Sequence, residues 1–283
     1  MGCPHRVGEP VSGAETAHAG YVHGYSGRED QRLLDQASSL ADLLHWDTVF
    51  APGSTVLEAG CGVGAQTVTI AQNSPEARIL SVDIAASSLA AARDRAARAG
   101  ITNVEFLQAD IFNLPFPAQS FDHVFVCFVL EHLNNPLGAL GRLKRFLKEG
   151  GTITAIEGDH GSAFFHPNSA AAQRAIQCLV DLQASTGGDA LIGRRLYPLL
   201  VAAGLKNVTV SPRMVYVDAS RPQLVDGFTR KTFNAMVEGV RDDAIAHGLI
   251  DEATWDQGLR DLHRTTEPDG VFCYTFFKAV ATT

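Results

Sequence analysis

The chain has 283 residues, of which 46% are hydrophobic and 19% charged, as in a globular protein of one large domain or two small ones. Its net charge of −8, without a dense run of lysine or arginine, argues against nucleic acid as a partner. We find neither a signal-peptide pattern nor an apolar stretch of the roughly 20 residues that a membrane span needs. We therefore expect no membrane partner and a cytoplasmic location.

The cysteines argue against both a disulfide framework and a zinc ribbon. There are five, an odd number, and they are scattered along the chain without a C-x-x-C pair. We expect them to be reduced thiols.

Strands and helices alternate through the first half of the sequence. Leucines at helical spacing predict a helix over 29–46, and near-continuous apolar runs predict the strands that follow. The predicted strands are 54–59, 77–84, 103–110, 121–128 and 151–158, and the helices between them are 65–73, 85–100 and 136–150. This alternation predicts an α/β fold, a Rossmann-like doubly wound sheet that is mostly parallel and covered by helices on both faces.

The rhythm changes after Gly158. We predict a helical stretch of about 25 residues, then a helix at 191–204, a strand at 207–218, a helical segment over 222–263 and a last strand at 271–280. The last two strands would form a hairpin that completes a seven-stranded sheet, with the final strand antiparallel. We expect an N-terminal lid and helix over 1–50 and one domain over 51–283, with helical insertions at about 161–190 and 222–264.

A glycine-rich loop, "EAGCGVGAQT" (58–67), follows the first predicted strand. Three glycines at alternate positions favour close approach of a ligand, and this turn of a doubly wound sheet is where a nucleotide-like ligand binds. Asp83 ends the second strand, where a carboxylate can accept both ribose hydroxyls, and Asp110 ends the third, near an adenine amino group. A bare packing turn, the alternative, needs neither carboxylate.

Binding of NAD is the rival interpretation, because "GCGVGA" also fits G-x-G-x-x-A. Glu58 argues against it, since a carboxylate at the strand end suits the ammonium group of an amino-acid ligand. Asp110 has no fixed role in hydride transfer, and the C-terminal hairpin differs from a second nucleotide-binding half.

Four segments resemble the class I S-adenosylmethionine-dependent methyltransferases: "VLEAGCGVGAQT", "SVDIA", "LQADIFNLPFP" and "FDHVFVCFVLEHLNNP", within about 55–158. The resemblance implies that S-adenosylmethionine contacts Glu58, Gly60 and Gly62 through its methionine part, Asp83 and Ile84 through ribose and adenine, and Asp110 and Ile111 at the adenine edge. It also implies that 128–131 faces the methyl-donor pocket, with Phe128 a donor contact. The tetrapeptide of base-methylating relatives is replaced by "CFVLEH", which disfavours nucleic-acid bases as substrates.

The flanks "YVHGYSGREDQRLLDQA", "IEGDHGSAFFHP" and "DGVFCYTFFKA" are similar to bacterial small-molecule methyltransferases, some of which methylate C3 of indole. This likeness implies a substrate pocket between the N-terminus and the loop after the fifth strand. From their chemistry, the candidate catalytic residues are His160, Tyr25, His23 and Asp159, beside Glu157. The candidate substrate contacts are Tyr21, Glu131, Phe164 and Phe165, and Arg32 is a candidate partner for the donor's carboxylate.

Each of these side chains also has a structural alternative, such as packing for a histidine or tyrosine and helix capping for Asp159. Methyl transfer needs a positioned nucleophile and a base but no metal, although His160, His166 and Asp159 permit a metal reading. We predict a small aromatic substrate, with the indole of a tryptophan cyclodipeptide as the leading candidate. Methylation of oxygen or nitrogen, donor binding without catalysis, and a homodimer stay open.

Overall fold

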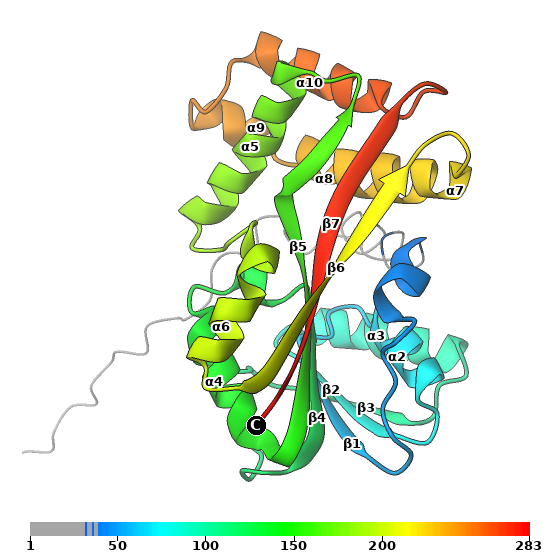
Figure 1. Ribbon diagram of the computed structural model, residues 1–283, viewed down its shortest axis with the longest axis vertical. Coiled ribbons are helices and arrows are strands. Elements are labelled where there is room, and N and C mark those ends of the chain that lie inside the picture. Colours follow the sequence, from blue (N-terminus) through cyan, green and yellow to red (C-terminus); the bar gives the residue numbers. More distant parts are fainter. Residues whose placement is uncertain (1–31, 33–35, 37–38) are drawn as a thin grey trace, which may run out of the picture.

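The structure, a computed structural model, describes residues 32, 36 and 39–283 and contains one seven-stranded sheet (Figure 1). The strand order is β3-β2-β1-β4-β5-β7-β6, and β7 runs antiparallel to both of its neighbours. The predicted fold class and the antiparallel last strand are thus confirmed. The strands are β1 (Thr55–Ala59), β2 (Arg78–Asp83), β3 (Val104–Gln108), β4 (Phe121–Cys127), β5 (Leu147–His166), β6 (Lys206–Val217) and β7 (Val271–Thr282).

Helices cover both faces of the sheet, because alternate residues of the buried strands point to opposite sides. On β4, Phe125 joins an apolar cluster with Ile70 of α2, whereas Val124 joins a second cluster with Leu140 of α4 and Leu196 of α6. Figure 1 accordingly shows α2 and α3 across the sheet from α4 and α6. Their bounds are α2 (Thr67–Asn73), α3 (Ala86–Arg98), α4 (Pro136–Phe146) and α6 (Leu196–Ala202), with 3₁₀ turns η1 (Leu130–His132) and η2 (Ile192–Arg195).

Strand β5 is longer than the sequence predicts. It continues past Gly158 to His166, where we expected a helical stretch to begin, and α5 (Ala170–Ser185) starts only after it, capped by Ser169. The reason is β7, which is long enough to pair with residues on both sides of a register shift between Asp159 and Phe164. A strand continues wherever a partner satisfies its backbone groups, and local periodicity does not reveal that partner.

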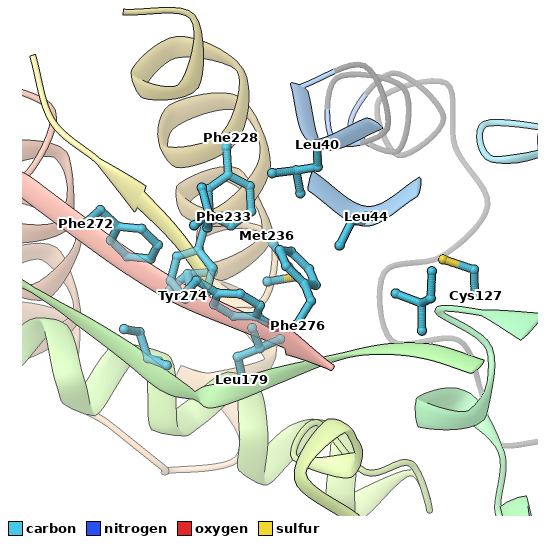
Figure 2. Packing of buried hydrophobic residues seen from close by; sticks show 14 of the residues in the cluster. Leu40, Leu44, Cys127, Leu179, Phe228, Phe233, Met236, Phe272, Tyr274 and Phe276 are labelled. Atoms are coloured by element: carbon cyan, nitrogen blue, oxygen red, sulfur yellow. The ribbon is translucent and has the colours of Figure 1, made fainter. Parts of the chain in front are cut away.

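The helical segment after β6 packs on the upper half of the sheet. It comprises α7 (Pro222–Leu224), the π-helix η3 (Val225–Asn234), α8 (Ala235–Glu238), α9 (Arg241–Ala246) and α10 (Glu252–Arg264). Figure 2 shows Phe228 and Phe233 of η3 packed on β7, with Leu40 and Leu44 of the helical residues 39–45 beside them.

An ion cluster with two buried cations fixes the end of that N-terminal helical stretch to the sheet. Lys278 of β7 donates hydrogen bonds of 2.6 Å to Asp47 and 2.7 Å to Thr48. Arg213 of β6 donates a hydrogen bond to the other carboxylate oxygen of Asp47. The Arg213 guanidinium also lies 5.2 Å from the ring of Trp46. Because both cations are buried, the Asp47 carboxylate is the charge that makes their burial tolerable.

No helix in the described part of the chain is long and apolar enough to cross a membrane. The four cysteines in that part, Cys61, Cys127, Cys178 and Cys273, are buried and free of disulfides.

Candidate active site

The three glycines of the loop after β1 all have positive φ, but they have different neighbours. A Cβ on Gly60 would lie 2.5 Å from Val129 Cγ2, and one on Gly64 would lie 2.9 Å from Ala92 Cβ. Among the described residues, a Cβ on Gly62, with φ +52°, would meet nothing within 4 Å. The expectation that all three clear space for a ligand is therefore wrong for Gly60 and Gly64, which leave room for Val129 and for α3; the contact of Gly60 with the donor stays a prediction. Of the three, Gly62 is the one whose side facing away from the backbone meets no atom of the described part of the chain.

Glu58, the penultimate residue of β1, is a buried carboxyl group. Its Oε2 accepts hydrogen bonds of 2.7 Å from Thr67 and 2.6 Å from Ser81. Burial raises the pKa of Glu58 to about 7, although the two hydroxyls act in the opposite direction. A cation placed beside this group would draw it into its charged form near neutral pH.

Asp83, at the end of β2, holds the loop in place. Its Oδ2 accepts a hydrogen bond of 2.8 Å from the backbone N–H of Gly62, and its Oδ1 accepts one of 2.9 Å from the backbone N–H of Ala85. A carboxylate has about four lone-pair sites, so two further donors, such as ribose hydroxyls, can be accepted. Ile84 follows with 45% of its surface exposed, as a side chain that packs on a flat ring requires.

Asp110, after β3, orders its own turn by accepting from the Phe112 backbone at 2.8 Å and from Asn113 at 2.9 Å. The Ile111 side chain is buried in the apolar core. The contact with adenine that the sequence predicts for this residue would therefore have to be made by its backbone atoms. Gln108 donates 3.0 Å to the Ile84 carbonyl and ties the ends of β2 and β3 together.

The turn after β4 lies against the glycine loop through the contact between Gly60 and Val129. Phe128 has φ +57°, which is unfavourable for a residue with a side chain and is found mainly where surrounding contacts enforce it. Glu157 supplies such contacts, because its Oε1 accepts hydrogen bonds of 3.1 Å from the Val129 N–H and 2.8 Å from the Leu130 N–H. Burial, and then the charge of Glu131, raise the pKa of Glu157 well above its usual value. Glu157 therefore acts here as a neutral group that shapes the turn.

His160 lies on β5 with its two ring nitrogens facing different partners. Its Nδ1 is 2.7 Å from the hydroxyl of Tyr274 on β7, and its Nε2 is 4.0 Å from Oε2 of Glu131. Burial lowers the pKa of His160, so the ring is neutral near pH 7. Gln183 donates 3.3 Å to the same Glu131 oxygen. The structure thus brings together His160 and Glu131, which the sequence placed in separate roles.

Tyr274 is the residue of this group that the sequence did not identify. It stands in an alternating aromatic strand, a pattern that indicates core packing, and it is 114 residues from His160. No local signal predicts such a pairing.

Asp159 does not orient the imidazole. Both of its oxygens accept 2.7 Å hydrogen bonds from Arg194 in a bidentate ion pair, and Oδ1 also accepts from Gly161. Phe164 and Phe165, the two phenylalanines predicted to contact the substrate, also differ from each other in their surroundings. Phe164 is 56% exposed, whereas Phe165 is buried and stacked on Phe272, so the two neighbours have different environments.

Arg32 lies close enough to Glu131 and His160 for its charge to lower the pKa of both. The remaining candidates, Tyr21, His23 and Tyr25, lie outside the described residues. Within the described ranges, no group of three or more His, Cys, Asp or Glu side chains is arranged to hold a metal ion.

Known proteins that resemble this chain in sequence or in fold include methyltransferases. Residues 57–155 match the family model of a methyltransferase domain. An uncharacterized 37.1 kDa protein of a Streptomyces fradiae transposon is 31% identical over 191 residues, 66% of this chain and 54% of that protein. A demethylmenaquinone methyltransferase of Listeria monocytogenes is 30% identical over 106 residues, 37% of this chain and 45% of that enzyme. The chain thus spans about half the length of these curated relatives.

Among solved structures, phosphoethanolamine N-methyltransferase 2 of Haemonchus contortus superposes with a TM-score of 0.53 at 15% identity, over 88% of this chain and 52% of that chain. Likeness at this identity concerns the fold. The matched segment is a methyltransferase domain. The strand order of the whole sheet and the glycine loop are those expected of the class I, S-adenosylmethionine-dependent methyltransferases that the sequence motifs resemble.

Proposed function

We propose that this chain transfers the methyl group of S-adenosylmethionine to a small aromatic molecule, and that C3 of the indole in a tryptophan-derived cyclodipeptide is the leading candidate acceptor. The observation that carries the proposal is a continuous set of aromatic rings from the donor-facing turn to His160. Phe128 lies 5.6 Å from Phe276, which lies 4.7 Å from Tyr274, and Tyr274 lies 5.9 Å from His160.

The residues at the strand ends fit the donor. Glu58 suits the ammonium group, Asp83 the ribose hydroxyls and the exposed Ile84 the adenine ring. The open space at Gly62 lets a ligand approach the backbone. When bound, S-adenosylmethionine supplies a methyl group whose bond to sulfur breaks as its bond to the acceptor forms, leaving S-adenosylhomocysteine and one acceptor proton to be removed.

The chain's own groups position the acceptor and take that proton. The buried rings of Phe228 and Phe233 lie 5.8 and 5.5 Å from Tyr274 and make the surroundings of its hydroxyl apolar and aromatic, which suits an aromatic acceptor. Oε2 of Glu131 lies 4.0 Å from Nε2 of His160, beyond hydrogen-bond distance, so this carboxylate oxygen can receive a proton from a bound acceptor. A sugar or phosphate acceptor would require more cationic groups than these rings provide.

The experiment is incubation of the purified chain with S-adenosylmethionine and, separately, a tryptophan cyclodipeptide, a phenol and an aromatic amine. Mass spectrometry and NMR should find one added methyl on C3 of the indole, with closure to a pyrroloindoline. Asp83→Ala is the matched control, since weakened donor binding should remove the product. Turnover of the phenol without turnover of any indole would contradict the indole assignment. Donor binding without turnover of any acceptor would favour a non-catalytic binding protein.

A further inference from the structure

The hydroxyl of Tyr274 occupies a place that only glycine at position 158 leaves free. A Cβ on Gly158 would lie 2.4 Å from that oxygen. From there the oxygen reaches Nδ1 of His160 at 2.7 Å and accepts a hydrogen bond from the backbone N–H of Asp159. The hydroxyl is therefore held from three sides, and its direction relative to the imidazole is fixed.

The hydrogen of this hydroxyl points to the imidazole. Burial raises the pKa of Tyr274 well above its usual value, so the phenol keeps its proton. The Asp159 N–H is a donor and cannot receive it. In the described part of the chain the acceptor at hydrogen-bond distance is Nδ1 of His160. Nδ1 then carries no hydrogen, and the neutral ring carries its single hydrogen on Nε2.

On the other side of the ring, Nε2 faces the carboxylate of Glu131. Burial acts to raise the pKa of Glu131, but nearby positive charge, that of His132 first, and the hydrogen bond from Gln183 act in the other direction, and the pKa is lowered, which favours the carboxylate. A hydrogen on Nε2 directed at this carboxylate is favoured by charge, whereas a lone pair there would be repelled. Both partners of His160 therefore select the same tautomer.

We propose that Tyr274 is a positioning residue that holds His160 as its Nε2–H tautomer, and that Glu131 receives the proton of the methyl acceptor. In that step the acceptor's N–H or O–H bond breaks and its electron pair stays on the acceptor. The hydrogen forms a bond to Oε2 of Glu131, which ends as a neutral carboxylic acid, while His160 keeps its hydrogen. The proposal rests on the proposed function for its acceptor but not for the tautomer.

Other charged groups around the ring bear on its titration. His160 is flanked by Tyr274 and Phe233, and the ionisable groups that act on it are Glu131, His132, Arg32 and Asp159. Asp159 is paired with Arg194, so Glu131, whose Oε1 lies 3.6 Å from Nε2 of His132, is the carboxylate that faces Nε2 of His160.

The tautomer can be measured without any methyl acceptor. In the full chain labelled with ¹⁵N-histidine, long-range ¹H–¹⁵N spectra distinguish the two tautomers, and His160→Gln assigns the signal. We expect the Nε2–H pattern in the unmodified protein and loss of a single tautomer in Tyr274→Phe, with the pattern retained in the control Tyr216→Phe on the exposed edge strand. An Nδ1–H pattern in the unmodified protein would overturn the proposal, whatever the acceptor proves to be.

Kinetics test the second half with whichever acceptor the chain turns over. Glu131→Gln should lower kcat by roughly 10²- to 10⁴-fold with little change in donor affinity. Tyr274→Phe should lower kcat more than it raises KM and should move the acidic limb of the pH profile, which a merely structural role would not do. A Glu131→Gln variant with unchanged kcat overturns the proposal. Should Glu131→Gln not fold, Glu131→Asp replaces it in the kinetic test. The tautomer of His160 in Tyr274→Phe still decides the role of Tyr274.

Discussion

The carboxylate of Asp83 accepts a 2.8 Å hydrogen bond from the backbone N–H of Gly62, 21 residues earlier in the chain. This bond joins the end of β2 to the point of the glycine loop that opens onto free space. It fixes the loop before any ligand arrives, so the site for the methyl donor is largely preorganised.

Replacing Asp83 should therefore affect both the loop and the ligand. Asp83→Ala should weaken binding of S-adenosylhomocysteine by about 2 to 3 kcal/mol, since charge-assisted hydrogen bonds are lost. Titration calorimetry measures the effect. Asp94→Ala, on the exposed face of α3, is the control and should bind as the unmodified protein does. Equal affinities for both variants would contradict the assigned role of Asp83.

Two glycine variants separate ligand space from packing. Both positions have positive φ, so alanine costs about 1 to 2 kcal/mol of stability at either one. At Gly62 the new methyl enters open space, and donor affinity should fall more than stability. At Gly64 it meets Ala92 of α3, and stability should fall more than affinity. Urea unfolding and calorimetry on both variants check this, and parallel losses in the two measurements would refute the distinction.

These residues were predictable because the motif is local in sequence. The loop, Glu58 and Asp83 all stand next to strands that apolar periodicity identifies, and the parallel sheet places strand ends together. Residues that depend on distant partners were not predictable. Asp159 is next to His160 in sequence but pairs with Arg194, and His160 instead meets Tyr274 on a strand far along the chain. The extension of β5 likewise depends on β7.

The raised pKa of Glu58 predicts a pH dependence of donor binding. The free protein holds a proton on Glu58 below about pH 7, and the ligand's ammonium requires the carboxylate. Affinity should thus rise about tenfold from pH 6 toward pH 8, one proton being released on binding. Glu58→Gln should bind more weakly and lose this acidic limb. Calorimetry in buffers of different ionisation enthalpy would count the proton, and an unchanged limb in Glu58→Gln would assign it to another group.

The same shift has the opposite sign for stability of the unliganded protein. The folded pKa of Glu58, about 7, lies above the 4.5 of an ordinary glutamate, so folding favours the protonated form. The stabilising contribution is fully present below about pH 4.5 and is lost as pH rises to about 7. Denaturant unfolding from pH 5 to 8 should show this decline in the unmodified protein and less of it in Glu58→Gln. A decline of equal size in both would show that Glu58 does not cause it.

Phe164 and Phe165 are neighbours with opposite environments. Phe165→Ala removes a buried ring stacked on Phe272 and should cost about 3 to 5 kcal/mol of stability. Phe164→Ala removes a mostly exposed ring and should change stability by less than about 0.5 kcal/mol. Thermal unfolding of the pair tests their placement. A larger loss for Phe164→Ala would mean that β5 beyond its register shift is turned the other way.

The central claim is that the strand ends of this sheet bind the methyl donor and not a dinucleotide. Titration calorimetry of the full chain with S-adenosylmethionine, S-adenosylhomocysteine and NAD tests it most directly. We predict saturable binding of the first two at one site per chain, weakened in Asp83→Ala, and no binding of NAD. Binding of NAD together with no response to either sulfur compound would contradict the account.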